Sequence, residues 1–132
     1  MKLINVLPHQ QDQTLEEFYT PSGLEDPMWT DSLLMMRSLV QYLEQEVDDS
    51  EKHVSLQLTF LHMSDPSRLG GITVSAWNGQ YKIEYTIPPH KAPWKHANVV
   101  GYTPDIVKAV EMLYQALSTS DKLSREYASF FE

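Results

Sequence analysis

The spacing of apolar residues predicts a long helix in the second quarter of the chain. Between residues 29 and 47 apolar side chains recur every three or four positions, which places them on one side of a helix: Leu33, Met36, Leu39, Val40, Leu43 and Val47. Thr30 is a suitable N-cap, and Trp29 before it can pack on Leu34. We therefore expect the helix to begin at Thr30 and to end in the acidic run 44–51.

Farther along the chain the period falls to two. In residues 53–63 apolar side chains alternate with polar ones, as they do in a half-buried strand: Val54, Leu56, Leu58 and Phe60. The sequence predicts one strand here.

The next apolar segment, residues 72–77, leads into Asn78-Gly79, a dipeptide that favours the type I′ turn of a two-residue hairpin. If these two residues form the loop, Val74 lies opposite Ile83 and the intervening positions pair polar residues with each other. One face of the hairpin is then apolar and the other polar, as a one-sided antiparallel sheet requires. We therefore expect a hairpin with Asn78-Gly79 at its tip.

The last third of the chain combines a proline-rich loop with helical spacing. Residues 88–96 contain three prolines, so this segment can be neither a central strand nor a helix interior. Thr103 and Pro104 then provide a cap and a first helical residue, and an apolar stripe follows: Ile106, Val110, Leu113 and Leu117. Because residues 118–120 interrupt the stripe, the sequence predicts either one broken helix or two separate helices.

Together these segments predict a single α+β domain over residues 1–132. A short N-terminal strand and a loop over residues 8–28, with one helical turn, come first. Since strands and helices do not alternate as in βαβ units, we expect an antiparallel sheet of three to four strands with the helices packed on one face. The polar face of the sheet is then either exposed to solvent or covered by a partner. Trp77, beside the turn on that face, is expected to cover a neighbouring element.

Composition adds a charge asymmetry to this picture. The 132 residues include 18 acidic and 10 basic side chains, for a net charge of −8. Residues 1–66 hold twelve acids and three bases, a net charge of −9, whereas residues 67–132 hold six acids and seven bases, a net charge of +1. So acidic a surface repels nucleic-acid phosphates and anionic membranes, and we expect neither as a partner.

The sequence also favours a cytoplasmic location. It contains no cysteine, which excludes disulfides and thiolate metal sites and fits a reducing compartment. The apolar start of the chain is broken by Asn5 and Pro8, which makes it too short for a signal peptide. No segment approaches the roughly 20 apolar residues that span a bilayer.

Sequence motifs for cofactor binding are absent. There is no GxGxxG or GxxxxGK that could cradle a phosphate. A calcium loop beginning at Asp48 would have His53 where glycine is required. We therefore expect no cofactor.

The histidines do not form a convincing catalytic or metal site in sequence. His90 and His96 lie in one loop without a carboxylate at ligand spacing. His62, Ser64 and Asp65 supply the residue types of a hydrolase triad, but such close neighbours cannot easily align. We therefore expect no metal, no catalytic residue and no enzymatic activity.

One loop leaves an alternative open. Around Trp94 lie Lys91, Lys95 and the two histidines of the loop, a mixture that could bind a small anion or single-stranded nucleic acid. We expect Trp94 to fold onto the core and anchor the loop. A small enzyme or ligand-binding domain that uses the His90–His96 loop or the polar sheet face is the alternative.

In size, acidity and α+β plan the chain resembles the small immunity proteins of bacterial toxin–immunity pairs, most closely in the hairpin over residues 72–87 and the helix over residues 103–117. The resemblance implies a cytoplasmic binding protein that neutralises a basic, nuclease-type toxin by forming an inhibitory complex. It implies no role for individual residues, because no family motif carries it. An adaptor subunit of a larger complex is a further alternative, and the oligomeric state is open.

Charge places the expected partner-binding surface in the first half of the chain. An acidic inhibitor meets a basic toxin faster and discriminates against other partners. The residues expected to face the partner are acids of this half, with Tyr19 as an aromatic anchor: Glu16, Glu17, Tyr19, Glu25, Asp26, Glu44, Glu46, Asp48, Asp49 and Glu51.

Overall fold

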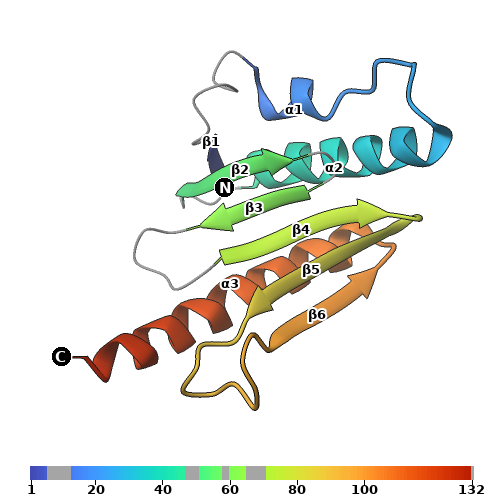
Figure 1. Ribbon diagram of the computed structural model, residues 1–132. Coiled ribbons are helices and arrows are strands. Elements are labelled where there is room, and N and C mark those ends of the chain that lie inside the picture. Colours follow the sequence, from blue (N-terminus) through green and yellow to red (C-terminus); the bar gives the residue numbers. More distant parts are fainter. Residues whose placement is uncertain (6–12, 47–50, 58–59, 65–70, 132) are drawn as a thin grey trace.

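Six strands in one sheet and two long helices make up most of the fold (Figure 1). The structure, a computed structural model, describes residues 1–5, 13–46, 51–57, 60–64 and 71–131. In the sheet the strands follow their order in the sequence: β1 (Lys2–Asn5), β2 (Glu51–Gln57), β3 (Phe60–Ser64), β4 (Gly71–Trp77), β5 (Gln80–Thr86) and β6 (Asn98–Thr103). The helices are α1 (Leu15–Phe18), α2 (Pro27–Gln45) and α3 (Ile106–Ser129).

The α+β class, the antiparallel sheet and the placement of helices on one face are confirmed, but the sheet is larger than expected. It has six strands rather than three to four. Strands β2 to β6 pair antiparallel, and β1 adds to the edge of β2 in parallel. The parallel pair joins residues about fifty positions apart in the chain. The local sequence pattern around β1 gives no information about which distant strand it pairs with.

The prediction of one strand over residues 53–63 was wrong. This segment belongs to two strands, β2 and β3, which pair antiparallel with Leu56 opposite Leu61. No glycine, proline or asparagine separates the two in the sequence, so the alternation alone gave no sign of the reversal. The C-terminal edge strand β6 was also missed, because it follows the proline-rich loop and lacks alternation of apolar with polar residues.

The hairpin prediction is confirmed residue by residue. Val74 pairs with Ile83, and Trp77 pairs with Gln80 at the closed end. Asn78 and Gly79 have φ angles of 52° and 76°, the positive values that a type I′ turn requires at both positions. The turn therefore sets the register that places alternate residues of β4 and β5 on the core face.

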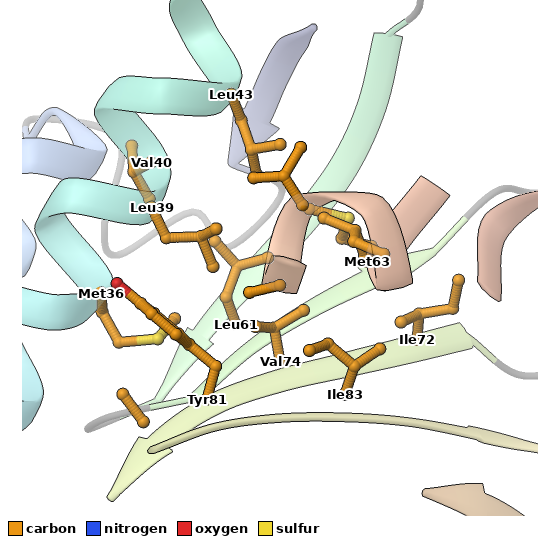
Figure 2. Packing of buried hydrophobic residues seen from close by; sticks show 14 of the residues in the cluster. Met36, Leu39, Val40, Leu43, Leu61, Met63, Ile72, Val74, Tyr81 and Ile83 are labelled. Carbon is orange, nitrogen blue, oxygen red and sulfur yellow. The ribbon is translucent and has the colours of Figure 1, made fainter. Parts of the chain in front are cut away.

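The core lies between the sheet and the two long helices (Figure 2). The sheet contributes buried side chains from alternate positions of three strands: Leu61, Met63, Ile72, Val74, Ala76, Tyr81 and Ile83. The helices contribute the faces predicted by their spacing: Met36, Leu39, Val40 and Leu43 from α2, and Ala109, Val110, Leu113, Ala116 and Leu117 from α3. Burying each large apolar side chain contributes about 1.5–3 kcal/mol, so this layer dominates stability.

The hydroxyl of Tyr81 is the polar group that joins the hairpin to α2. It donates a 2.8 Å hydrogen bond to the carbonyl oxygen of Met35. Burial of the ring raises the pKa of Tyr81 to about 12.

Helix α2 begins earlier than expected. Its N-cap is Asp26, whose side chain accepts a hydrogen bond from the Met28 N–H, and Pro27 occupies the first helical position. Thr30, the expected cap, lies inside the helix. Trp29 consequently does not act as a staple before the cap. Its ring instead meets the ring of Trp77 edge-on at 5.2 Å, so Trp77 does cover a neighbouring element, as predicted.

Helix α3 is one continuous helix of 24 residues, neither broken nor divided. Its N-cap is Asp105 rather than Thr103; the Asp105 side chain accepts from the N–H groups of Val107 and Lys108. Residues 118–120, which suggested an interruption, lie inside the helix: Ser118 and Thr119 are exposed, and Ser120 is buried. The buried Ser120 thus belongs to the face that packs on the sheet together with Leu113 and Leu117, and the apolar stripe continues through it.

We expect Gly79→Ala to lower the free energy of unfolding by about 1–2 kcal/mol, because a side chain in the left-handed region meets the following carbonyl oxygen. Urea denaturation measures the change. The matched variant Asn78→Gly retains access to positive φ and should change stability much less. An unchanged unfolding midpoint for Gly79→Ala would show that this turn does not hold the register.

Candidate functional site

The acids expected to face a partner fall into two groups at opposite ends of α2. Glu25 and Asp26 precede its first turn, whereas Glu44 and Glu46 lie at its C-terminal end. Nineteen residues at 1.5 Å each separate these ends by roughly 28 Å. The acids expected to face a partner therefore lie on two separate surfaces, held apart by the helix that the apolar spacing predicted.

Helix α1 joins the group at the C-terminal end of α2. Its one turn has the capping box of Thr14 and Glu17, and Glu16 accepts a 3.3 Å hydrogen bond from the side-chain amide of Gln41. Glu16, Glu17, Glu44 and Glu46 are called the acidic cluster below. Of the other expected residues, Asp48 and Asp49 lie outside the described residues. Glu51 begins β2, where its backbone pairs with that of Lys2.

The acids at the other end of α2 have structural roles. Glu25 accepts hydrogen bonds from the Ser22 N–H at 2.8 Å, the Ser22 hydroxyl at 2.7 Å and the Gly23 N–H at 3.0 Å. These bonds lower the pKa of Glu25 to about 2. Asp26 caps α2. Both carboxylates fix the loop before the helix, which is a sufficient reason for acids at these positions.

Tyr19 is not a surface anchor. Its side chain has no exposed area, and it packs edge-on against the ring of Phe18 at 5.1 Å. Burial raises the pKa of its hydroxyl well above the usual range. Tyr19 follows the buried Leu15 by four positions, so the spacing of a single helical turn could have indicated its inward direction.

The electrostatics of the acidic cluster centre on Glu44. Its pKa is raised, first by partial burial and then by the negative charge of Glu16, although the positive amino group of Met1 acts in the opposite direction. That amino group donates hydrogen bonds to the carbonyl oxygens of Leu43 at 2.9 Å and Glu46 at 3.2 Å, at the negative end of the α2 dipole. The fold thus brings two like charges together from helices far apart in sequence.

The polar face of the sheet is internally paired. Lys82 and Glu84 approach to 3.7 Å, and the Thr86 hydroxyl donates to the side-chain oxygen of Asn98 at 3.1 Å. His62 Nδ1 lies 3.0 Å from the Thr73 hydroxyl. The triad alternative has no support here, since the described contact of His62 is with a strand neighbour, and Asp65 lies outside the described residues.

The proline-rich loop is more open than expected. Trp94 is 71% exposed, so the prediction that it folds onto the core was wrong. The loop packs on the C-terminal end of α3 through His90, whose ring centroid lies 5.5 Å from those of Tyr127 and Phe130. His90 Nε2 also lies 3.4 Å from a Glu126 oxygen.

Beside Trp94 lies an apolar groove of about 560 Å³, bordered by Pro88, Pro89, His96 and Tyr127. His96 is exposed and has a φ of 62°. In the part of the chain that the structure describes, no three histidine, aspartate or glutamate side chains gather closely enough to hold a metal ion.

No protein-family model, curated protein or solved structure matches this chain. The resemblance to immunity proteins therefore stays a prediction. Among the described helices, none combines the length and the apolar character needed to cross a bilayer.

We expect Glu44→Gln to raise the free energy of unfolding at neutral pH, by less than about 1 kcal/mol because the group is partly exposed. The folded chain holds the Glu44 proton to a higher pH than the unfolded chain does, so ionisation of Glu44 makes stability fall as the pH rises between the two pKa values. Below pH 4.5, the ordinary value, the gain from Glu44→Gln should vanish. Urea denaturation of both proteins, from acidic to neutral pH, measures the difference in their free energies of unfolding.

The control for this prediction is a double-mutant cycle with Glu16→Gln. If the two carboxylates repel each other, Glu16→Gln should raise the free energy of unfolding less in the Glu44→Gln background than in the wild-type chain. Strictly additive effects would show that the two charges do not interact.

We expect Trp94→Ala to change the free energy of unfolding by no more than about 0.5 kcal/mol, since most of the ring is exposed. Trp29→Ala is the matched variant. It removes the ring contact with Trp77 and should lower stability by about 0.5–1.5 kcal/mol beyond the loss of buried area. Chemical denaturation compares them, and an equal loss in both variants would contradict the exposed position of Trp94.

Proposed function

We propose that this chain is a binding protein whose acidic cluster contacts a basic surface of a partner protein. As the resemblance to immunity proteins implies, the partner is a basic toxin, which this chain neutralises. The observation that carries the proposal is the juxtaposition of Glu16 and Glu44. A folded protein gains no stability from holding these two carboxylates near each other. Desolvation is the main reason why the pKa of Glu44 is raised, and repulsion by the negative charge of Glu16 raises it further. A lysine or arginine of a partner between them would remove this repulsion.

The charge of the whole chain supports the same kind of partner. A net charge of −8, located in the first half, speeds the encounter with a basic protein and disfavours acidic competitors. Exposed ion pairs contribute only about 0–1 kcal/mol each, so affinity has to come from the carboxylates that become desolvated. Glu44 is best placed for this role, because desolvation already raises its pKa although its side chain remains exposed, while Glu17 and Glu46 act mainly on the association rate.

The partner to test is the protein encoded by the gene next to that of this chain. Its C-terminal domain is expressed alone and together with this chain, and survival of the cells is measured. Under the proposal the domain is basic and toxic, the two proteins copurify, and toxicity is relieved. A neighbouring product that neither harms the cells nor binds this chain would contradict the proposal.

We expect the double variant Glu44→Lys, Glu46→Lys to slow association with this partner by at least tenfold at low salt, measured by surface plasmon resonance. It should also weaken the dependence of the rate on ionic strength. The control is Asp31→Lys with Glu111→Lys, which changes the net charge equally at exposed positions outside the acidic cluster. Equal rates for the two double variants would show that the cluster is ordinary solvated surface.

The exposed Trp94 and its groove favour a second candidate, a ligand-binding domain that uses the proline-rich loop. The two candidates predict different effects of Trp94→Ala. Under the toxin-binding proposal this variant retains protection and copurification. Loss of both with an intact acidic cluster would move the binding site to the loop.

A further inference from the structure

The C-terminal edge of the sheet is an unprotected strand. β6 is the last strand in the sheet order, and no described element pairs with its outer side. Natural edge strands usually carry a charge, a proline or a bulge that prevents further pairing. The segment Asn98–Thr103 contains no charged residue and no proline, and its backbone pairs with β5 without a break in register.

The pairing pattern shows which backbone groups point outward. The Ile87 N–H donates to the Ala97 carbonyl oxygen at 2.9 Å, which makes these two residues a hydrogen-bonded pair in line with the β5–β6 register. In an antiparallel ladder such pairs alternate with non-hydrogen-bonded ones. Val99, Gly101 and Thr103 therefore direct their N–H and C=O groups toward β5. Those of Asn98, Val100 and Tyr102 face away from the sheet.

The side chains along this edge are unusually apolar for an exposed surface. Val99 is 40% exposed, Val100 43% and Tyr102 60%. Between β6 and α3 an open hollow of about 620 Å³ is bordered by Val99, Gly101, Met112 and Ala116. The edge therefore offers both free backbone groups and an apolar recess below them.

We propose that this edge is a self-association site, in which β6 pairs antiparallel with β6 of a second copy about a two-fold axis at Val100. In this register Val100 lies opposite Val100 of the second copy, and the outward backbone groups of Asn98 meet those of Tyr102. Val99, on the helix side of the sheet, lies opposite Gly101 of the second copy. A large side chain thus meets a small one at each end of the strand, so the segment is complementary to itself.

The distribution of charge favours a second copy over a basic partner at this site. The net charge of −8 belongs to the first half of the chain, whereas residues 67–132 carry +1. The sheet order places β1 and β2, from the acidic half, at the opposite end from β6. Two copies that meet at β6 therefore keep their acidic parts far apart, whereas a strongly basic protein gains nothing from this edge.

Sedimentation equilibrium of the full chain over a range of concentrations tests the proposal. We expect a reversible dimer of twice 15.2 kDa. Val100→Lys places two positive charges opposite each other and should raise the dimer dissociation constant at least tenfold. Leu24→Lys, at a residue 93% exposed in the loop before α2, is the matched control and should leave it unchanged. A wild-type chain that stays monomeric up to its solubility limit, or an undiminished dimer with Val100→Lys, would overturn the proposal.

Val100→Pro provides a second variant that the monomer should tolerate. The Val100 N–H faces away from β5, so its loss breaks no hydrogen bond within the chain. Circular dichroism should therefore be unchanged while the dimer is lost. A dimer that survives Val100→Pro would contradict the pairing.

Disulfide cross-linking through an introduced cysteine can test the proposed β6–β6 register, since the chain has no cysteine of its own. A hydrogen-bonded antiparallel pair has its Cα atoms about 5.5 Å apart, within the range that a disulfide spans. Val100→Cys should form a covalent dimer on mild oxidation much faster than Leu24→Cys. Equal rates would exclude an axis at Val100. These variants leave the acidic cluster intact, so their outcome is independent of toxin binding.

Discussion

Asn78 and Gly79 occupy the two positions of positive φ that close the β4–β5 hairpin, and through them they decide which way every residue of these strands faces. A slip of one residue would turn Val74 and Ile83 away from the helices. The apolar stripes of α2 and α3 would then have no matching surface. In the sheet order the hairpin lies between β3 and β6 and pairs with both, so its register also determines which way their residues face.

The sheet built on this register separates two kinds of surface. On one side of the molecule α1 and the end of α2 bring Glu16 and Glu44 together. At the opposite end of the sheet, β6 presents free backbone groups among uncharged side chains. Charge repulsion and an unsatisfied strand edge are both unfavourable in an isolated domain, and under the two proposals above each would be relieved by contact with another protein. The two proposed contacts would take different partners, because one surface is acidic and the other neutral.

The acids of the first half have different roles although they are chemically the same. Glu25 and Asp26 accept backbone hydrogen bonds beside the start of α2 and so stabilise the fold. Glu44 is made harder to ionise, first by desolvation and then by the charge of Glu16. The difference comes from the surroundings of each residue: loop and helix N–H groups stabilise the carboxylates of Glu25 and Asp26, whereas no described N–H group donates to Glu44 in the same way.

The sequence by itself determined the hairpin, the apolar faces of α2 and α3, the single turn of α1 and the α+β class. Each of these depends on residues close together in the chain, whose turn chemistry or period is a local property. It also showed an acidic first half and a helix between Glu25 and Glu44, but not that Glu16 lies near Glu44. Only the tertiary structure decided that β1 pairs with β2, that β6 forms an edge, that Tyr19 is buried and that α3 continues through its serines. These features depend on contacts between distant segments, and the free energy of such contacts overrides local preferences that differ by only about 1 kcal/mol.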